Sequence, residues 1–156
     1  MANPFGESRW FHRIGHVTNT VPLRMMTPTG IAVVTTTGRK SGKPRARAMR
    51  AVRQGGRVYA VAILGPSTDW IANLRADPAV TVKLGTKTYR ARGHVLSDAE
   101  ELARAAEAYR PIAGWYDYVD YANFVWAAPS KAKLLRAHDE WFARGTPVVF
   151  ELEDAP

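Results

Sequence analysis

The sequence of 156 residues contains no cysteine, which excludes disulfides, thiol catalysis and thiolate metal sites. This absence fits a cytoplasmic protein, and we expect that location. The longest run without a charged residue, 25–38, has only 14 residues and contains proline, glycine and threonine, so it cannot span a bilayer. The N-terminus lacks the basic-then-apolar order of a secretory signal. At this length, with 46% hydrophobic residues, we expect one folded domain.

Acidic residues are missing from residues 8–68, although the chain has 14 of them against 22 lysines and arginines. The same stretch holds 11 lysines and arginines, whereas residues 97–156 carry 11 acids and 6 bases. The net charge of +8 therefore belongs to the first half. Such a charge attracts nucleic acid, an acidic membrane surface, or a small phosphorylated or polycarboxylate ligand. The alternative is a solvated basic face that only keeps the protein soluble.

The sequence has no G-x-G-x-x-G fingerprint and no G-x-S-x-G nucleophile elbow. Its segment 38–44, Gly-Arg-Lys-Ser-Gly-Lys-Pro, is not a P-loop, because three residues separate the glycines and proline replaces the Ser or Thr. A turn with two glycines nevertheless exposes backbone N–H groups, and Arg39, Lys40, Lys43 and Arg45 surround it. This combination suits a phosphate or a carboxylate. A plain solvated hairpin turn is the alternative.

Histidine and carboxylate patterns indicate no metal or acid–base site. His12 and His16 are four residues apart, but Arg13 stands where the zincin pattern has glutamate, so we expect no metal. His94 and His138 are isolated, and we expect each to be a packed or surface residue. No pair of carboxylates stands out as a general acid–base couple.

Periodicity and turn residues predict about six strands, at 31–37, 45–54, 57–64, 80–84, 87–96 and 146–153. They also predict helices at 7–17 and 69–76. A third helix begins at a capping box, Ser97-Asp-Ala-Glu100, and runs to Tyr109, and a fourth begins at Ser130 and ends before Gly145. Short turns join most of the strands. The pattern therefore indicates a small β-barrel with helices at its ends.

An aromatic segment, 115–126, has Trp115, Tyr118, Tyr121 and Phe124 at intervals of three residues. One interpretation is a helical stripe that packs on the barrel. The other is a lid over a flat conjugated ligand, in which phenol groups donate a hydrogen bond or a proton.

Three segments, taken in their order along the chain, resemble the deazaflavin-dependent nitroreductase family. They are Thr35-Thr-Thr-Gly-Arg-Lys-Ser-Gly-Lys-Pro-Arg45, Gly55-Gly-Arg57 and Asp69-Trp-Ile-Ala-Asn-Leu-Arg-Ala-Asp-Pro78-Ala-Val-Thr-Val82. The resemblance covers roughly residues 31–97. It implies an α+β fold, a split β-barrel (FMN-binding-like) of about six antiparallel strands with peripheral helices. It also implies one domain, 1–156, with an N-terminal helical arm (1–25), a barrel core with the cofactor motifs (31–96), helices with an aromatic lid (97–145), and a final strand and tail (146–156).

The resemblance implies that the cofactor is the deazaflavin coenzyme F-420, held by three groups of residues. The turn and the arginine after it would hold the phosphate and the acidic tail; these are Gly38, Arg39, Lys40, Ser41, Gly42 and Arg45. The backbone of Ala48, Met49 and Arg50 would lie along the ring. The end of the next strand and the short helix would complete the site with Ala62, Ile63, Leu64, Gly65, Trp70 and Asn73.

Tyr118 and Tyr121 fall where the family has tyrosines that face the substrate, so the resemblance implies a catalytic role for them. It implies substrate contacts for Trp115 and Phe124. Three positions differ from the family pattern: Leu64 stands where a lysine would help to bind phosphate, Arg50 where the residue is usually apolar or aromatic, and Trp115 where a tyrosine is usual.

We therefore expect an oxidoreductase that transfers hydride from the reduced coenzyme to a small quinone, enone or nitro compound. The polyanionic tail of the coenzyme suits the half of the chain that has no acids. The alternatives are a non-catalytic carrier of the cofactor and an FMN-dependent enzyme on the same barrel. A nucleic-acid-binding barrel is disfavoured, because the aromatic residues cluster in the acidic half.

Two further expectations concern partners. The apolar face of the helix at 7–17, flanked by Arg9 and Arg13, could rest on an anionic membrane as a peripheral contact, although packing against the barrel is favoured. Small split barrels commonly pair, so a homodimer is expected.

Overall fold

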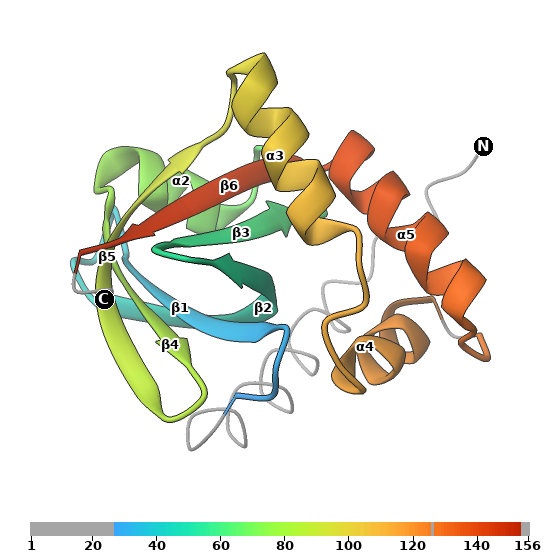
Figure 1. The fold of residues 1–156 in the computed structure, drawn as a ribbon. Helices are drawn as coiled ribbons and strands as arrows, with labels where there is room; N and C mark the ends of the chain where they lie inside the picture. The colour runs from blue at the N-terminus through green and yellow to red at the C-terminus, as the bar shows by residue number, and fades with distance from the viewer. Residues whose placement is uncertain (1–26, 126, 154–156) are drawn as a thin grey trace.

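The computed structural model describes residues 27–125 and 127–153, with all their side chains except those of Asn123 and Phe124. The predicted helix at 7–17, with His12 and His16, lies outside these residues. Six strands form a closed antiparallel barrel in the described part of the chain, and their order is β1-β2-β3-β6-β5-β4 (Figure 1). Their bounds are β1 Ile31–Thr37, β2 Pro44–Gln54, β3 Arg57–Ala62, β4 Ala79–Leu84, β5 Lys87–Val95 and β6 Thr146–Leu152. The predicted barrel is confirmed.

The strand register follows the predicted hairpins. Gly55 adopts φ +59° between β2 and β3, and Gly85 adopts φ +60° between β4 and β5, a left-handed conformation that costs glycine little. β1 pairs with β2 on one side, Ile31 opposite Arg50, and with β4 on the other, Val33 opposite Lys83. β6 is last in sequence, but it lies between β3 and β5 and closes the barrel.

Four helices complete the described residues: α2 (Asp69–Ala76), α3 (Ala99–Tyr109), α4 (Tyr116–Val125) and α5 (Lys131–Arg144). The last three gather along one side of the barrel (Figure 1). Ser130 caps α5 as predicted, its hydroxyl accepting from the Lys133 backbone N–H at 3.4 Å. The predicted Ser97 cap of α3 is wrong by one residue. Asp98 Oδ1 accepts from the N–H groups of Glu100 and Glu101, because aspartate caps as well as serine and is charged beside the helix N-terminus.

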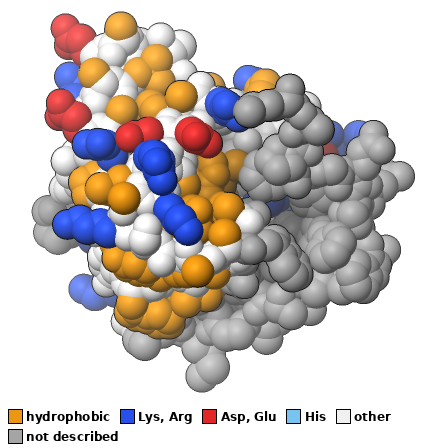
Figure 2. Space-filling model, turned by 90° about the vertical axis from the view of Figure 1, so that its right-hand side faces the viewer, with side chains coloured by type: hydrophobic (Ala, Val, Ile, Leu, Met, Phe, Trp, Pro, Cys, Tyr) orange, Lys and Arg blue, Asp and Glu red, His pale blue; other side chains and the backbone are white. Residues whose placement is uncertain are grey.

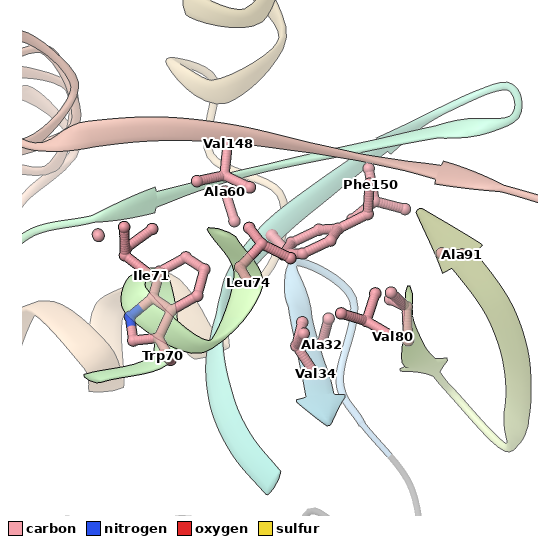
Figure 3. Close-up of a cluster of buried hydrophobic side chains, with 14 residues drawn as sticks. Ala32, Val34, Ala60, Trp70, Ile71, Leu74, Val80, Ala91, Val148 and Phe150 are labelled. Atoms are coloured by element: carbon pink, nitrogen blue, oxygen red, sulfur yellow. The ribbon is translucent and has the colours of Figure 1, made fainter. Parts of the chain in front are cut away.

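The main core fills the barrel and includes the apolar face of α2. Trp70, Ile71 and Leu74 pack among strand side chains that include Val148 and Phe150 (Figure 3). A second cluster, built on Tyr59, Leu96 and Val149, receives the inner face of α3. Among the described residues, no helix is both long enough and apolar enough to cross a membrane.

Candidate functional site

The turn between β1 and β2 satisfies most of its own backbone donors. Gly38 N–H donates to the Lys43 carbonyl at 2.9 Å, and the N–H groups of Ser41 and Gly42 donate to the Gly38 carbonyl at 3.1 and 2.7 Å. Lys43 N–H reaches Ser41 Oγ at 3.3 Å. We expected these N–H groups to be exposed to an anion, and that expectation is wrong. The turn is a closed structure whose free donors are side chains.

Arg39 anchors this turn to α2. Its backbone N–H and its Nη1 both donate to Asn73 Oδ1 at 3.1 Å, and Nη1 also lies 3.1 Å from Asp69 Oδ1. Asn73 is buried, and its Nδ2 donates to Thr36 Oγ1 at 3.4 Å. The structure therefore brings the predicted turn and Asn73 together, and Arg39 is bound to residues of α2.

The remaining cations of the turn point into solvent. Lys40, Lys43 and Arg45 are exposed, and no ion pair or hydrogen bond of their side chains occurs among the described residues. No acid lies within residues 8–68 to neutralise them locally. The arrangement presents three exposed cations beside a hydrogen-bonded turn, which suits an anion with several charges.

Arg47 is a residue that the sequence patterns did not single out. It lies opposite Val34 in the β1–β2 ladder, on the side of β2 that Met49 and Ala51 direct toward the core. Burial lowers the pKa of Arg47, and Asp69 partly opposes this. Within the described part of the chain its guanidinium has no hydrogen bond. A half-buried guanidinium without a hydrogen bond is costly, so its donors suit an anionic ligand.

The other face of β2 is small and apolar. Ala46 and Ala48 pack against Ile31 and Val33 of β1, and Tyr116 of α4 packs against the same two residues. Of the residues expected along the cofactor ring, Ala48 thus lies on this face and Met49 packs against the barrel core.

Arg50, the third residue expected along the ring, turns its side chain away from any open surface. Its Nε lies 3.0 Å from Asp117 Oδ1, and both side chains are 1% exposed. Nη1 and Nη2 donate to the carbonyls of Tyr109 and Pro111 at 2.6 Å, and the guanidinium stacks 4.3 Å from the centre of the Tyr109 ring. Arg50 therefore ties the barrel to the α3–α4 connection, and only its backbone is available to a cofactor.

Three titratable groups around this ion pair have perturbed pKa values. Burial, with Asp117 next, raises the pKa of Asp120 to about 7. Burial raises the pKa of Tyr109 to about 12, and burial followed by Arg50 lowers that of His138. His138 Nδ1 lies 2.8 Å from the Arg110 carbonyl, so this histidine is a packed residue, as predicted. Asp117 and Asp120 were not predicted from the sequence as a pair of neighbouring carboxylates. Their spacing of three residues, which places both on one face of a helix, was the signal that could have identified them.

The loop from β3 to α2 contains the remaining predicted cofactor residues. Ala62 and Gly65 are buried, Gly65 N–H donating to the Ala62 carbonyl at 2.9 Å, while Leu64 is exposed. Ile63 packs against the cluster between α4 and α5. The Trp70 ring lies in the barrel core, 6.5 Å from that of Phe150.

The aromatic segment forms α4, and its rings point in different directions. Tyr121 is buried and Tyr118 half-buried in a cluster with Leu134 and Trp141 of α5. Trp115 precedes the helix and is 68% exposed. The side chain of Phe124 lies outside the described residues. On the side where Figure 1 places α4 and α5, hydrophobic side chains gather between lysines and arginines (Figure 2).

No group of three or more histidine or acidic side chains that could hold a metal occurs in residues 27–125 and 127–153. His94 is half-exposed, with Nε2 3.8 Å from Glu101 Oε2, and is a surface residue as predicted.

Solved structures with the same fold include a conserved hypothetical protein from Mycobacterium tuberculosis, with a TM-score of 0.52, 15% identity, and coverage of 79% of this chain and 72% of that one. A candidate pyridoxamine 5′-phosphate oxidase from Listeria innocua gives a TM-score of 0.51 at 12% identity, covering 90% and 96%. These likenesses show the fold. A structure named F420-H2 dependent reductase is 25% identical, with a TM-score of 0.47 and coverage of 80% and 94%. The closed barrel and the two structures with TM-scores above 0.5 define the chain as a small split-barrel protein with a cationic turn.

The sequence model of the F420H(2)-dependent quinone reductases matches residues 7–126, and the chain belongs to this family. It is therefore an oxidoreductase, a reductase that depends on coenzyme F-420. The match confirms the resemblance to deazaflavin-dependent enzymes found in the sequence.

Proposed function

We propose that this reductase transfers hydride from reduced F-420 to a small organic acceptor, a quinone, an enone or a nitro compound, and that the β1–β2 turn holds the coenzyme. The observation that carries the proposal is that only one of the four cations of the turn is bound to other described residues of the protein. Arg39 is bound to Asn73 and Asp69, whereas Lys40, Lys43 and Arg45 are exposed without a partner among the described residues.

The chemistry of these donors fits the coenzyme. F-420 carries a phosphodiester and a chain of glutamates, and exposed lysines and arginine attract such a polyanion. Arg47 supports the same assignment, because its half-buried guanidinium has donors that match a phosphate or a carboxylate. Lys40, Lys43, Arg45 and Arg47 would hold the tail, and the backbone of β2 near Ala48 would lie along the ring.

When bound, the coenzyme supplies the hydride. The protein holds the acceptor against the donor, excludes water and offers a polar group to the charge that develops on the acceptor. Ala46 and Ala48 are half-buried, and their small side chains suit the approach of a flat ring to the backbone of β2. The name of the family supports a quinone as the acceptor. Trp115, which directly precedes α4, is exposed and offers an aromatic surface to such a ring.

Fluorescence titration with F-420 and with FMN tests coenzyme binding. We expect F-420 to bind, and Lys40→Ala/Lys43→Ala and Arg47→Ala each to weaken it by at least about tenfold, the loss of one or more charge-assisted contacts. Raised salt should weaken binding further. Lys87→Ala is the matched control, an exposed lysine in the β4–β5 hairpin, whose turn lies toward the Ile31 end of β1 and away from the 38–43 turn. Tight binding of FMN without F-420 would overturn the proposal.

Turnover tests the acceptor class. Oxidation of reduced F-420 is followed with a quinone, an enone and a nitroaromatic compound, and we expect a quinone to be reduced. A protein that binds F-420 but oxidises it with none of the three is a carrier, and the proposed reaction is then wrong. The homodimer stays a prediction, which light scattering on the purified protein tests.

A further inference from the structure

Most of the exposed large hydrophobic side chains of the described residues belong to α4. Trp115, directly before the helix, is 68% exposed, Val119 is 38% exposed and Val125 is 40% exposed. The Trp115 carbonyl accepts from the Tyr118 N–H at 3.2 Å, so the first helical turn already includes Trp115, and Val119 follows at the spacing of one helical face. Within the described part of the chain, Leu64 on the β3–α2 loop is the remaining residue of this kind. We call Trp115, Val119 and Val125 the apolar surface of α4.

The charged residues of α4 point the opposite way. Asp117 is 1% exposed and pairs with Arg50 of β2, and Asp120 is 6% exposed. They are the only charged residues between Arg110 and Lys131 in the sequence. A surface helix normally turns its charges to water and its apolar side chains to the core, and α4 shows the reverse. An exposed apolar patch without charge is typical of a surface that meets an apolar partner.

The loop between α4 and α5 extends this surface and brings positive charge to its border. Ala127, Ala128 and Pro129 are exposed. Lys133 Nζ donates to the Ala128 carbonyl at 3.1 Å, so its ammonium group lies directly beside the loop. Lys131, at the first position of α5, is exposed as well. The apolar surface of α4 therefore leads along the chain into a pair of lysines.

The two lysines do not serve the helix that carries them. Lys131 and Lys133 lie in the first turn of α5, which contains no acid, although the N-terminus of a helix favours negative side chains. Neither lysine forms an ion pair within the part of the chain that the structure describes. Their position is unfavourable for α5 alone, and it favours a partner that carries negative charge.

We propose that the apolar surface of α4 and the lysines at the start of α5 form a docking surface for an anionic lipid membrane, with α4 parallel to the bilayer. With ten residues, α4 is about 15 Å long, so it lies on a bilayer and does not cross it. Tryptophan is favoured at the membrane–water interface, and lysines beside it attract anionic headgroups. α4 and α5 lie at the edge of the molecule, where this contact leaves the barrel in water (Figure 1).

The chemistry of the surface favours a membrane over a protein partner. Protein interfaces form about one hydrogen bond per 100–200 Å² of buried surface. Of the three side chains of the apolar surface of α4, only Trp115 carries a hydrogen-bonding group, its indole N–H. The inference goes beyond the proposed function and does not depend on it. It places the contact on α4 and α5 and not on the predicted helix at 7–17.

Sedimentation with vesicles of phosphatidylglycerol and phosphatidylcholine in equal parts tests the apolar surface of α4. We expect the full chain to bind these vesicles, and Trp115→Ser/Val119→Ser to bind at least about tenfold more weakly, because two apolar side chains no longer enter the interface. Leu64→Ser is the matched control, an exposed apolar residue on another loop, and it should bind as wild type. Equal binding of the double variant and wild type overturns the proposal.

Two variants that remove the same charge test the lysines. Lys131→Gln/Lys133→Gln should weaken binding to the mixed vesicles by at least about tenfold, the contribution of two lysines near an anionic surface. Lys40→Gln/Lys43→Gln removes two lysines from the β1–β2 turn and should lose less than about threefold. Equal losses in the two variants would mean that the vesicles respond only to net charge, and the docking surface is then wrong.

Quenching of tryptophan fluorescence by brominated lipid locates the contact without a change of charge. The chain has five tryptophans, and the difference between wild type and Trp115→Phe isolates Trp115. We expect mixed vesicles that contain the brominated lipid to quench Trp115, because its ring enters the interface. Vesicle-bound protein in which Trp115 is not quenched overturns the proposal.

Other partners for the membrane or for the apolar surface of α4 give different results. If a second copy covers the surface, light scattering without lipid shows a dimer that Trp115→Ser/Val119→Ser dissociates, and wild type does not bind vesicles. If the helix at 7–17 makes the contact, Trp10→Ser/Phe11→Ser abolishes vesicle binding and Trp115→Ser/Val119→Ser does not. Either result overturns the proposal. Titration with F-420 in the absence of vesicles reports on the proposed function separately.

Discussion

Arg50 and Asp117, which are 67 residues apart in sequence, meet inside the protein with Nε and Oδ1 separated by 3.0 Å. Asp117 Oδ2 also accepts from the backbone N–H of Ala113 at 2.6 Å, so the carboxylate fixes the turn that enters α4. The pair thus links a barrel strand, the end of α3 and the start of α4. The Arg50 side chain therefore connects α4 to the barrel.

Asp117→Asn should destabilise the protein by about 3–5 kcal/mol, because it leaves the Arg50 guanidinium buried without its counter-charge. Urea denaturation measures the change. Asp139→Asn is the control: its pair with Arg110, at 3.0 Å, is half-exposed and should contribute less than about 1 kcal/mol. Equal small losses in the two variants would show that the buried pair does not hold α4.

Asp120 should make stability fall as pH rises. Its folded pKa of about 7 lies above the ordinary value of 3.8, so between these values the folded protein binds more protons than the unfolded chain. The free energy of unfolding therefore decreases from about pH 4 to about pH 7 and is flat above. His138 acts in the opposite sense, because burial lowers its pKa below the ordinary value of 6.5. Its contribution to the free energy of unfolding therefore increases as the pH rises toward 6.5.

The difference between wild type and Asp120→Asn, measured by urea denaturation from pH 4.5 to 8, cancels the histidine contribution. The variant should gain stability relative to wild type as pH rises to 7. A difference that is constant over this range would show that Asp120 is ionised throughout in the folded protein.

Tyr109→Phe should raise the free energy of unfolding by about 1 kcal/mol. The Tyr109 hydroxyl is buried and has no hydrogen-bond partner among the described residues, whereas the ring contact with Arg50 needs no hydroxyl. Thermal denaturation measures the effect. Tyr59→Phe, whose hydroxyl interacts with Arg57, should gain nothing. A loss of stability in Tyr109→Phe would reveal a partner for this hydroxyl.

Asn73→Ala should loosen the β1–β2 turn. It removes the acceptor of the Arg39 backbone N–H and of Arg39 Nη1, so we expect a loss of about 1–3 kcal/mol together with weaker F-420 binding. Asp69→Asn removes only the exposed partner of Arg39 and should leave both nearly unchanged. Denaturation and fluorescence titration measure the two quantities. An Asn73→Ala variant that binds F-420 as tightly as wild type would mean that the turn keeps its shape without the hydrogen bonds between Arg39 and Asn73.

The barrel was predictable because its signals are local. The strand 31–37 is a β-branched run between two glycines, and its predicted bounds equal those of β1. The helix 69–76 also matched, since Thr68 and Asp77-Pro78 delimit it. The strand predicted to reach Leu64 ends at Ala62, because Gly65 donates back to the Ala62 carbonyl and turns the chain there.

The candidate site was less predictable, because side-chain direction depends on contacts that are distant in sequence. Arg50 follows Ala48 on the same strand, but its partner Asp117 lies in another element, and no spacing reports their meeting. The same limit applies to the turn, where cations crowd the sequence but one of them, Arg39, is occupied by Asn73. The tyrosines of α4 are close together in sequence, yet only the packing against α5 or the barrel separates Tyr121 from Tyr116.

The position of β6 between β3 and β5 has a consequence for biogenesis. Because β6 follows the other five strands of the barrel in sequence and pairs with both neighbours, these five strands can form only an open sheet during synthesis. Two unpaired edges, on β3 and β5, then stay exposed to other nascent chains until β6 emerges. We expect this interval, rather than the stability of the finished barrel, to set the yield of folded protein in the cell.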